Sequence, residues 1–224
     1  MALVLKNSSA ALNQHSFSPY ADNGGYVSLA VAGDDFVVIA SDSRLSTGYS
    51  IYTRDQSKLF KLSNDSVLGC CGCWCDVLSL TKLLEARMQM YLHEHQKVMS
   101  TPAISQMLST MLYYKRLFPY YILNILAGFD NDGKGVVYSY DPIGNLEKSK
   151  FKAGGSSGAL LQPVLDNQVC TFVENPISEE KLPKKIVDAF ISATERDIYT
   201  GDSIILNIIT REGIREEKFE LRKD

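Results

Sequence analysis

The sequence predicts a single α+β domain in which two antiparallel sheets are covered on their outer faces by helices. Three observations support this fold class. Strand-like segments come in hairpins, helical periodicity is confined to two blocks between groups of strands, and strands and helices do not alternate one to one as in a parallel sheet. The 224 residues are 45% apolar and 22% charged, a globular composition. A chain of this length buries roughly 70% of its unfolded surface, so its core needs no disulfide or structural metal.

The first strands form two hairpins. Tyr26–Ala32 alternates in the manner of a strand, residues 33–35 favour a turn, and Phe36–Ala40 is typical of a buried returning strand. A second, shorter pair is predicted over Lys58–Leu62 and Val67–Cys71, joined by polar residues that favour a turn.

Two consecutive helices follow. Apolar residues at three- and four-residue spacing predict a long amphipathic helix over about Cys75–His95; they are Val77, Leu80, Leu84, Met88 and Tyr91. Thr101, as N-cap, followed by Pro102 at the first helical position, predicts the start of a second helix. Its apolar face carries Ile104, Met107, Leu108 and Met111.

The second half of the chain repeats this order of strands and then helices. An antiparallel meander is predicted over Tyr121–Phe129, Gly135–Tyr140 and Leu146–Lys152, and Gly154-Gly155 is expected to end it. A short helix is predicted over Ala159–Leu165, and a long one opening at Ser178 with an inner face of Ile186, Val187, Phe190 and Ile191. Ser203–Thr210 and Ile214–Leu221 form the final hairpin.

One domain is therefore expected over residues 24–224, behind an N-terminal arm or propeptide over residues 1–23. The arm, rich in Ser, Asn and Ala, is compatible with an ordered extension, a loose tail or a removable propeptide. Ala2–Leu5 is too short for a signal-peptide core. The longest apolar runs fall short of the ~20 residues of a membrane-spanning helix, so no membrane association is expected.

Charge and cysteine content narrow the function classes. A formal net charge of -3 argues against nucleic-acid binding through an electropositive face. Four of the five cysteines fall within Cys70–Cys75, where bridges between such close neighbours have poor geometry. This favours a reducing compartment, the cytosol or the nucleus.

The cysteine cluster leaves two interpretations open. Cys70 and Cys73, with His93 or His95, could ligate zinc in a metal or redox module. The alternative is a group of small buried thiols at a strand-to-helix corner, with His15, His93 and His95 as solvated surface histidines. The common signatures of a hydrolase nucleophile or of a phosphate-binding loop are missing.

A scattered set of residues is more specific. Asp42 and Arg44 lie in an Ala-Ser-Asp-Ser-Arg motif after a strand, and Lys58 follows the aspartate by sixteen residues. The set also contains Gly154-Gly155-Ser156 and the sequence Arg-Asp-Ile-Tyr-Thr-Gly-Asp over Arg196–Asp202. This pattern resembles the proteasome beta subunits of the N-terminal-nucleophile hydrolase superfamily, from about Phe17 to the C-terminus. Four stretches resemble in particular the beta type-1 subfamily, which is non-catalytic and holds the sixth position of the eukaryotic beta ring; they span residues 17–25, 118–130, 133–142 and 152–169.

The resemblance implies a four-layer αββα sandwich, the N-terminal-nucleophile hydrolase fold. It implies other beta and alpha proteasome subunits as partners, in stacked seven-membered rings of the 20S core particle. It also implies a location in cytoplasm and nucleus and a role in ubiquitin- and ATP-dependent protein degradation. No cofactor or metal is expected.

The same resemblance assigns the site positions. Active members free a threonine by autocleavage after a glycine, and that threonine attacks the peptide carbonyl. Asp42, Lys58, Asp197 and Thr200 match the residues around this nucleophile, and Gly25 matches the glycine before the cleaved bond. The nucleophile position itself holds Tyr26, whose phenol lies too far from the preceding carbonyl for the acyl shift that cleaves the chain.

Gly155 likewise stands where active members have a serine. The leading hypothesis is thus a non-catalytic structural subunit with vestigial site positions at Tyr26, Asp42, Lys58, Gly155, Asp197 and Thr200. The three charged residues among them are expected to form one internal ion-pair network.

The alternative is an active threonine/serine-type endopeptidase subunit with an unexpected nucleophile. Ser28 lies two residues after Tyr26, on the same strand face. Liberating it would require cleavage of the Val27–Ser28 bond, which no glycine precedes.

Overall fold

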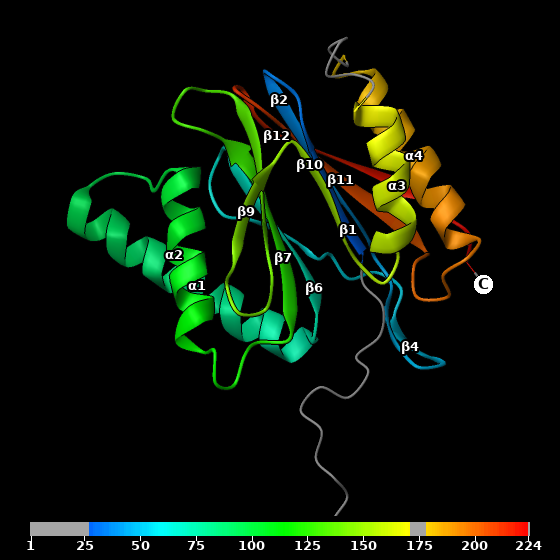
Figure 1. Cartoon of the computed structure of the whole chain (residues 1–224), viewed down its shortest axis with the longest axis horizontal. Helices are drawn as coiled ribbons and strands as arrows, with labels where there is room; N and C mark the ends of the chain where they lie inside the picture. The colour runs from blue at the N-terminus through cyan, green and yellow to red at the C-terminus, as the bar shows by residue number, and fades with distance from the viewer. Residues whose placement is uncertain (1–26, 171–177, 224) are drawn as a thin grey trace, which may run out of the picture.

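Two five-stranded antiparallel sheets pack face to face, and helices cover their outer faces (Figure 1). The structure is a computed structural model and describes residues 27–170 and 178–223. Helices α1 (Trp74–His95) and α2 (Thr101–Tyr114) cover one sheet, and α3 (Gly158–Cys170) and α4 (Lys181–Thr194) cover the other. The predicted four-layer αββα sandwich is confirmed. The arm, Gly25 and Tyr26 lie outside the described residues.

The sheet under α3 and α4 has the strand order β10-β1-β2-β11-β12. Its strands are β10 (Phe151–Gly155), β1 (Val27–Ala32), β2 (Phe36–Asp42), β11 (Ser203–Thr210) and β12 (Gly213–Glu220). β1 is paired on both sides, so that Ser28 lies opposite Gly154 on β10 and Ser41 on β2.

The sheet under α1 and α2 has the order β5-β6-β7-β8-β9. Its strands are β5 (Leu59–Lys61), β6 (Ser66–Gly72), β7 (Ile122–Phe129), β8 (Gly135–Tyr140) and β9 (Leu146–Ser149). All neighbours pair antiparallel, as the hairpin pattern predicts.

Strand alternation divides the core into three apolar layers. On β1, Leu29 and Val31 pack toward α3 and α4, whereas Ala30 and Ala32 belong to the layer between the sheets. That middle layer is tight: a Cβ on Gly69 would lie 3.1 Å from Ile39 Cδ1. A polar side chain on the inner face of β1 is therefore enclosed by both sheets.

The predicted strand Leu146–Lys152 is wrong as one element. The chain leaves one sheet after Ser149 and enters the other at Phe151, so β9 and β10 belong to different sheets. The meander of β7, β8 and β9 ends at Ser149 and not at Gly154-Gly155. These two glycines are the last residues of β10, which belongs to the other sheet. Residues 147–150 contain no glycine or proline that would mark a break, and a local pattern does not reveal a change of partner.

A small hairpin is absent from the sequence-based prediction. β3 (Leu45–Thr47) and β4 (Ser50–Thr53) form a two-stranded sheet whose turn contains Gly48 at φ +56°. Three of the four β4 residues are exposed, so no apolar alternation marks the strand.

Helix ends also differ from the prediction. Ser100, not Thr101, is the N-cap of α2; the buried Thr101 hydroxyl instead forms a hydrogen bond of 2.7 Å with that of Ser66. α4 begins at Lys181 rather than Ser178, and Ile191 is 46% exposed rather than on the inner face. The buried face of α4 instead carries the smaller Ala189 and Ala193 beside Ile186 and Phe190.

α3 is nearly twice as long as the predicted Ala159–Leu165 and continues past Pro163. Leu161, Leu165 and Val169 pack on the sheet along its whole length, and this burial outweighs the hydrogen bond that proline removes. Within residues 27–170 and 178–223, no helix is both long and apolar enough to cross a bilayer.

Candidate functional site

A buried ion pair lies beneath the first residue of β1. Asp42, at the end of β2, accepts hydrogen bonds through Oδ1 from Lys58 Nζ at 2.5 Å and from the Val27 backbone N–H at 3.1 Å. Both charged side chains are completely buried. The side chains at the predicted positions 42 and 58 are thus in direct contact. The Asp42 carboxylate also holds the backbone where β1 begins, through the Val27 N–H.

Burial and pairing act in opposite directions on Asp42. Desolvation raises the pKa of its carboxyl, because the charged form loses water. The Lys58 ammonium and the Val27 N–H oppose that rise by stabilising the carboxylate. The ion pair therefore offsets part of the free-energy cost of burying the Asp42 carboxylate.

A serine and a cysteine meet beside this pair. The Cys71 thiol on β6 donates a hydrogen bond to Ser28 Oγ on β1, at 2.9 Å. Ser28 is 0% exposed, and burial raises the pKa of Cys71 to about 11. Ser28 is enclosed between the sheets in a strand paired on both sides, which is unfavourable for a nucleophile that must be released as a chain terminus.

Asp197 organises a second cluster. Its Oδ2 accepts hydrogen bonds from the hydroxyls of Ser156 at 2.7 Å, Ser157 at 2.5 Å and Thr200 at 2.7 Å. Its Oδ1 accepts the Tyr199 backbone N–H at 3.0 Å. Desolvation alone would raise the pKa of Asp197, but these four hydrogen bonds together hold it below its usual range.

The single ion-pair network expected for Asp42, Lys58 and Asp197 is therefore wrong. Asp42 and Lys58 pair with each other, whereas Asp197 is held by hydroxyl groups. Ser156 belongs to the Gly154-Gly155-Ser156 stretch of the sequence pattern, which assigns it no role in the site, and Ser157 is not among the predicted residues. Their signal in the sequence is the Gly-Gly-Ser-Ser run, which could have indicated that hydroxyls follow the strand end.

The two clusters lie around the same strand end. Gly155 is the register partner of Val27, and Ser156 follows directly after it. Asp42 and Lys58 approach Val27 from the other side. The predicted positions 42, 58, 155, 197 and 200 thus lie around the start of β1 at Val27, whereas residue 26 is outside the described residues.

A third buried group joins the neighbouring loops. Arg44 Nε donates to Asp202 Oδ2 at 2.8 Å, and Arg54 Nη1 donates to Asp202 Oδ1 at 2.5 Å. Desolvation raises the pKa of Asp202, but the two arginines outweigh it and lower the pKa overall. A Cβ on Gly201 would lie 2.6 Å from Arg44 Nη2. Glycine at 201 therefore leaves room for the guanidinium, and Asp202 pairs with it.

Among the described residues, Cys70 and Cys73 do not form a metal site with His93 or His95. Cys73 is the N-cap of α1, whereas the exposed His93 and His95 end that 22-residue helix, roughly 33 Å away. In residues 27–170 and 178–223, no group of three or more potential ligands could hold a metal ion. The expectation of buried thiols holds for Cys70 and Cys71, while Cys73 is partly exposed and Cys75 is exposed.

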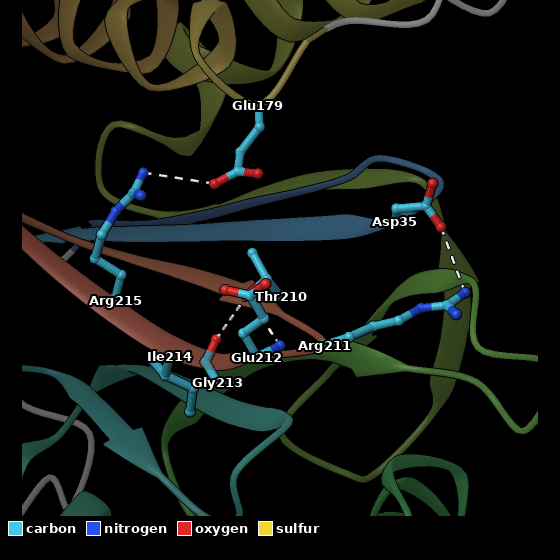
Figure 2. Close-up of a pocket in the computed structure, with 8 residues that line it drawn as sticks. All are labelled: Asp35, Glu179, Thr210, Arg211, Glu212, Gly213, Ile214 and Arg215. Carbon is cyan, nitrogen blue, oxygen red and sulfur yellow. Dashed lines mark hydrogen bonds and ion pairs between the residues drawn. The ribbon is translucent and has the colours of Figure 1, made fainter.

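A cavity of about 570 Å³ lies at the opposite end of the sheet, beside the turn between β11 and β12 (Figure 2). β2 separates its Asp35 from Asp42 by about 20 Å. Four of its charged side chains form two ion pairs: Arg211 lies 3.4 Å from Asp35, and Arg215 lies 3.5 Å from Glu179. It offers no concentrated charge for a ligand and takes no part in the site around β1.

Comparison of the sequence with known proteins identifies the family of this chain. The model of the family described as "Proteasome subunit" matches residues 22–209. The chain belongs to the proteasome subunit family. It is 56% identical to "Proteasome subunit beta type-1" of Drosophila melanogaster, over 93% of this chain and 91% of that protein. It is 55% identical to "Proteasome subunit beta type-1-B" of Carassius auratus, over 94% and 91%.

A plant relative, "Proteasome subunit beta type-1" of Petunia hybrida, is 46% identical over 94% of this chain and 98% of its own length. The resemblance to proteasome beta subunits, and to the beta type-1 subfamily in particular, is confirmed. The family-model match over residues 22–209 includes the four helices of the described residues and every described position of the site.

Proposed function

We propose that this chain is a non-catalytic structural beta subunit of the 20S proteasome core particle, needed to complete a seven-membered beta ring. The observation that carries the proposal is Tyr26 directly after Gly25, at the position where the family's active members need threonine. Tyrosine lacks a hydroxyl within reach of the preceding carbonyl, so neither self-cleavage nor attack on a substrate peptide can begin there.

The surrounding site favours a structural role as well. Asp42 and Lys58 form a buried ion pair, and the half-buried Asp197 accepts hydrogen bonds from three hydroxyls. A buried ion pair must keep both partners whether or not catalysis occurs, since removing one partner is strongly destabilising. The scaffold is therefore retained for folding, and its retention does not require an active nucleophile.

The proposed partners are other beta subunits in the same ring, a facing beta ring and an alpha ring. The proposed location is the cytoplasm and nucleus, where the particle would take part in ubiquitin- and ATP-dependent protein degradation. The family assignment and the similarity to beta type-1 subunits support this assembly role. Exposed apolar side chains on several elements, among them Tyr49, Leu83 and Leu160, suit a chain with several neighbours.

Native separation of a tagged chain, followed by intact-mass measurement, tests the proposal. The chain is expected to migrate in a very large particle, with a mature start inside the arm or no cleavage. Migration as a stable monomer would contradict the assembly role. A mature start at Ser28 would instead support the alternative of an active endopeptidase subunit.

A further inference from the structure

The segment between α2 and β7 exposes an unusual concentration of aromatic and apolar side chains. Tyr114 is 82% exposed, Leu117 91% and Phe118 63%, and three further large side chains of this region are exposed: Tyr113, Tyr121 and Leu123. We call residues 113–121, which are the end of α2 and the connection to β7, the 113–121 loop; the connection is the green segment below α2 in Figure 1. Large exposed apolar areas are rare on proteins without a partner and mark interaction sites.

The same loop carries positive charge without nearby compensation in the sequence. Lys115 and Arg116 are both exposed, and no acidic residue occurs between Met111 and Asp130. Among the described residues neither side chain forms an ion pair; instead Arg116 lies 5.0 Å from the Tyr113 ring centre and Lys115 lies 5.9 Å from that of Tyr120. The cations and rings thus form one combined surface.

The loop is also anchored to the body of the protein. Asp76 in the first turn of α1 accepts the Tyr121 backbone N–H through Oδ2 at 2.9 Å, and the Cys73 N–H donates to the Tyr121 carbonyl at 2.8 Å. A Cβ on Gly72 would lie 2.2 Å from that carbonyl, so the close approach requires glycine. An anchored surface loses less conformational entropy on binding than a mobile one.

We propose that the 113–121 loop is a docking surface for an acidic, apolar-containing segment of a neighbouring protein subunit. Charge complementarity decides the occupant: the chain carries a net charge of -3, yet this loop carries two cations and no carboxylate. Aromatic side chains and arginine are the residue types enriched at the energetic centres of protein interfaces. The inference rests on the proposed assembly role and specifies one of its contacts.

Two double variants of the full chain separate the contributions. Lys115→Glu with Arg116→Glu reverses the charge, and Leu117→Ser with Phe118→Ser removes the apolar anchors. Each is expected to lower incorporation into the large particle at least about tenfold in competition with the unaltered chain, because interface anchors contribute that much or more. Lys97→Glu with Lys134→Glu, two exposed lysines elsewhere without an ion pair among the described residues, is the matched control and should incorporate normally.

A photoreactive p-benzoylphenylalanine at position 117 identifies the occupant within the purified particle. The expected crosslink joins this residue to a Glu- or Asp-containing segment of a different subunit. A crosslink to a second copy of this chain, the absence of any crosslink in a particle that contains the chain, or normal incorporation of both loop variants would overturn the inference alone. An unaltered chain that stays outside the particle would overturn the proposed function together with it.

Discussion

At the scale of single residues, Lys58 and Asp42 form a buried ion pair in which each residue constrains substitution of the other. Both side chains are withdrawn from water at the end of β2, and their contact is what makes their charges tolerable. Asp42 also holds the Val27 N–H, which ties the pair to the position of β1. Loss of either residue would leave an uncompensated charge between the sheets.

Lys58→Met is therefore expected to lower the free energy of unfolding by about 3–5 kcal/mol, as for other broken buried pairs. Urea unfolding of the full chain measures it. The double variant Lys58→Met, Asp42→Leu should recover much of the loss, because no unpaired charge remains.

Lys61→Met provides the matched control, since Lys61 pairs with Glu216 at 3.0 Å on the surface, with both side chains about half exposed. Its effect should stay within about 1 kcal/mol. If Lys58→Met and Lys61→Met lowered the free energy of unfolding equally, the buried pair would contribute no more to stability than the surface pair.

The lowered pKa of Asp197 predicts that the stability of the fold depends on pH. Its folded-state pKa lies below the ordinary value of about 3.9, so its contribution to stability is complete above about pH 4 and is lost as the pH falls through the lowered value. Asp197→Asn should cost on the order of 1 kcal/mol near pH 6, allowing for solvent screening of a half-buried group.

Thermal unfolding of both forms between about pH 2.5 and pH 7 checks this expectation. The difference between their melting temperatures should shrink below pH 4, where the wild-type carboxyl also becomes neutral. A difference that stays constant across the range would show that the carboxylate charge is not what the three hydroxyls stabilise.

At the scale of elements, the contact of Arg44 with Gly201 joins the start of β3 to the loop before β11. Gly201→Ala would place a Cβ within 2.6 Å of the guanidinium, whose position is fixed by Asp202 and by the Ile198 carbonyl. We expect a loss of about 1–3 kcal/mol from overpacking, together with displacement of the β3–β4 hairpin.

Gly154→Ala is the control for this substitution, because the added Cβ would meet only Ile125 Cδ1, at 3.5 Å. In denaturant unfolding, Gly201→Ala should lower the free energy of unfolding more than Gly154→Ala does. The opposite order would mean that the guanidinium moves aside at little cost.

The elements themselves were largely accessible from the sequence. Period-two alternation and turn residues located the main hairpins, and three- and four-residue periodicity located α1 and α2. β3 and β4 were missed because they are short and mostly exposed. The division between β9 and β10 was missed because strand periodicity records which face is buried and not which sheet the strand joins.

At the scale of the whole molecule, the site depends on the register between distant segments. The pairing of Val27 with Gly155 brings the Asp197 cluster to the same strand end as Asp42 and Lys58. The family resemblance placed these positions in one site, but it did not separate the ion pair from the hydroxyl cluster. That separation comes from hydrogen-bond geometry, which requires the packed sheets.

The central claim is that this chain contributes structure and no nucleophile to a proteasome core particle. A threonine-directed covalent inhibitor, applied to the purified particle and followed by intact-mass measurement of every subunit, tests it most directly. The account predicts adducts on sibling subunits and an unchanged mass for this chain. An adduct on this chain, at Ser28 or at any other residue, would contradict it.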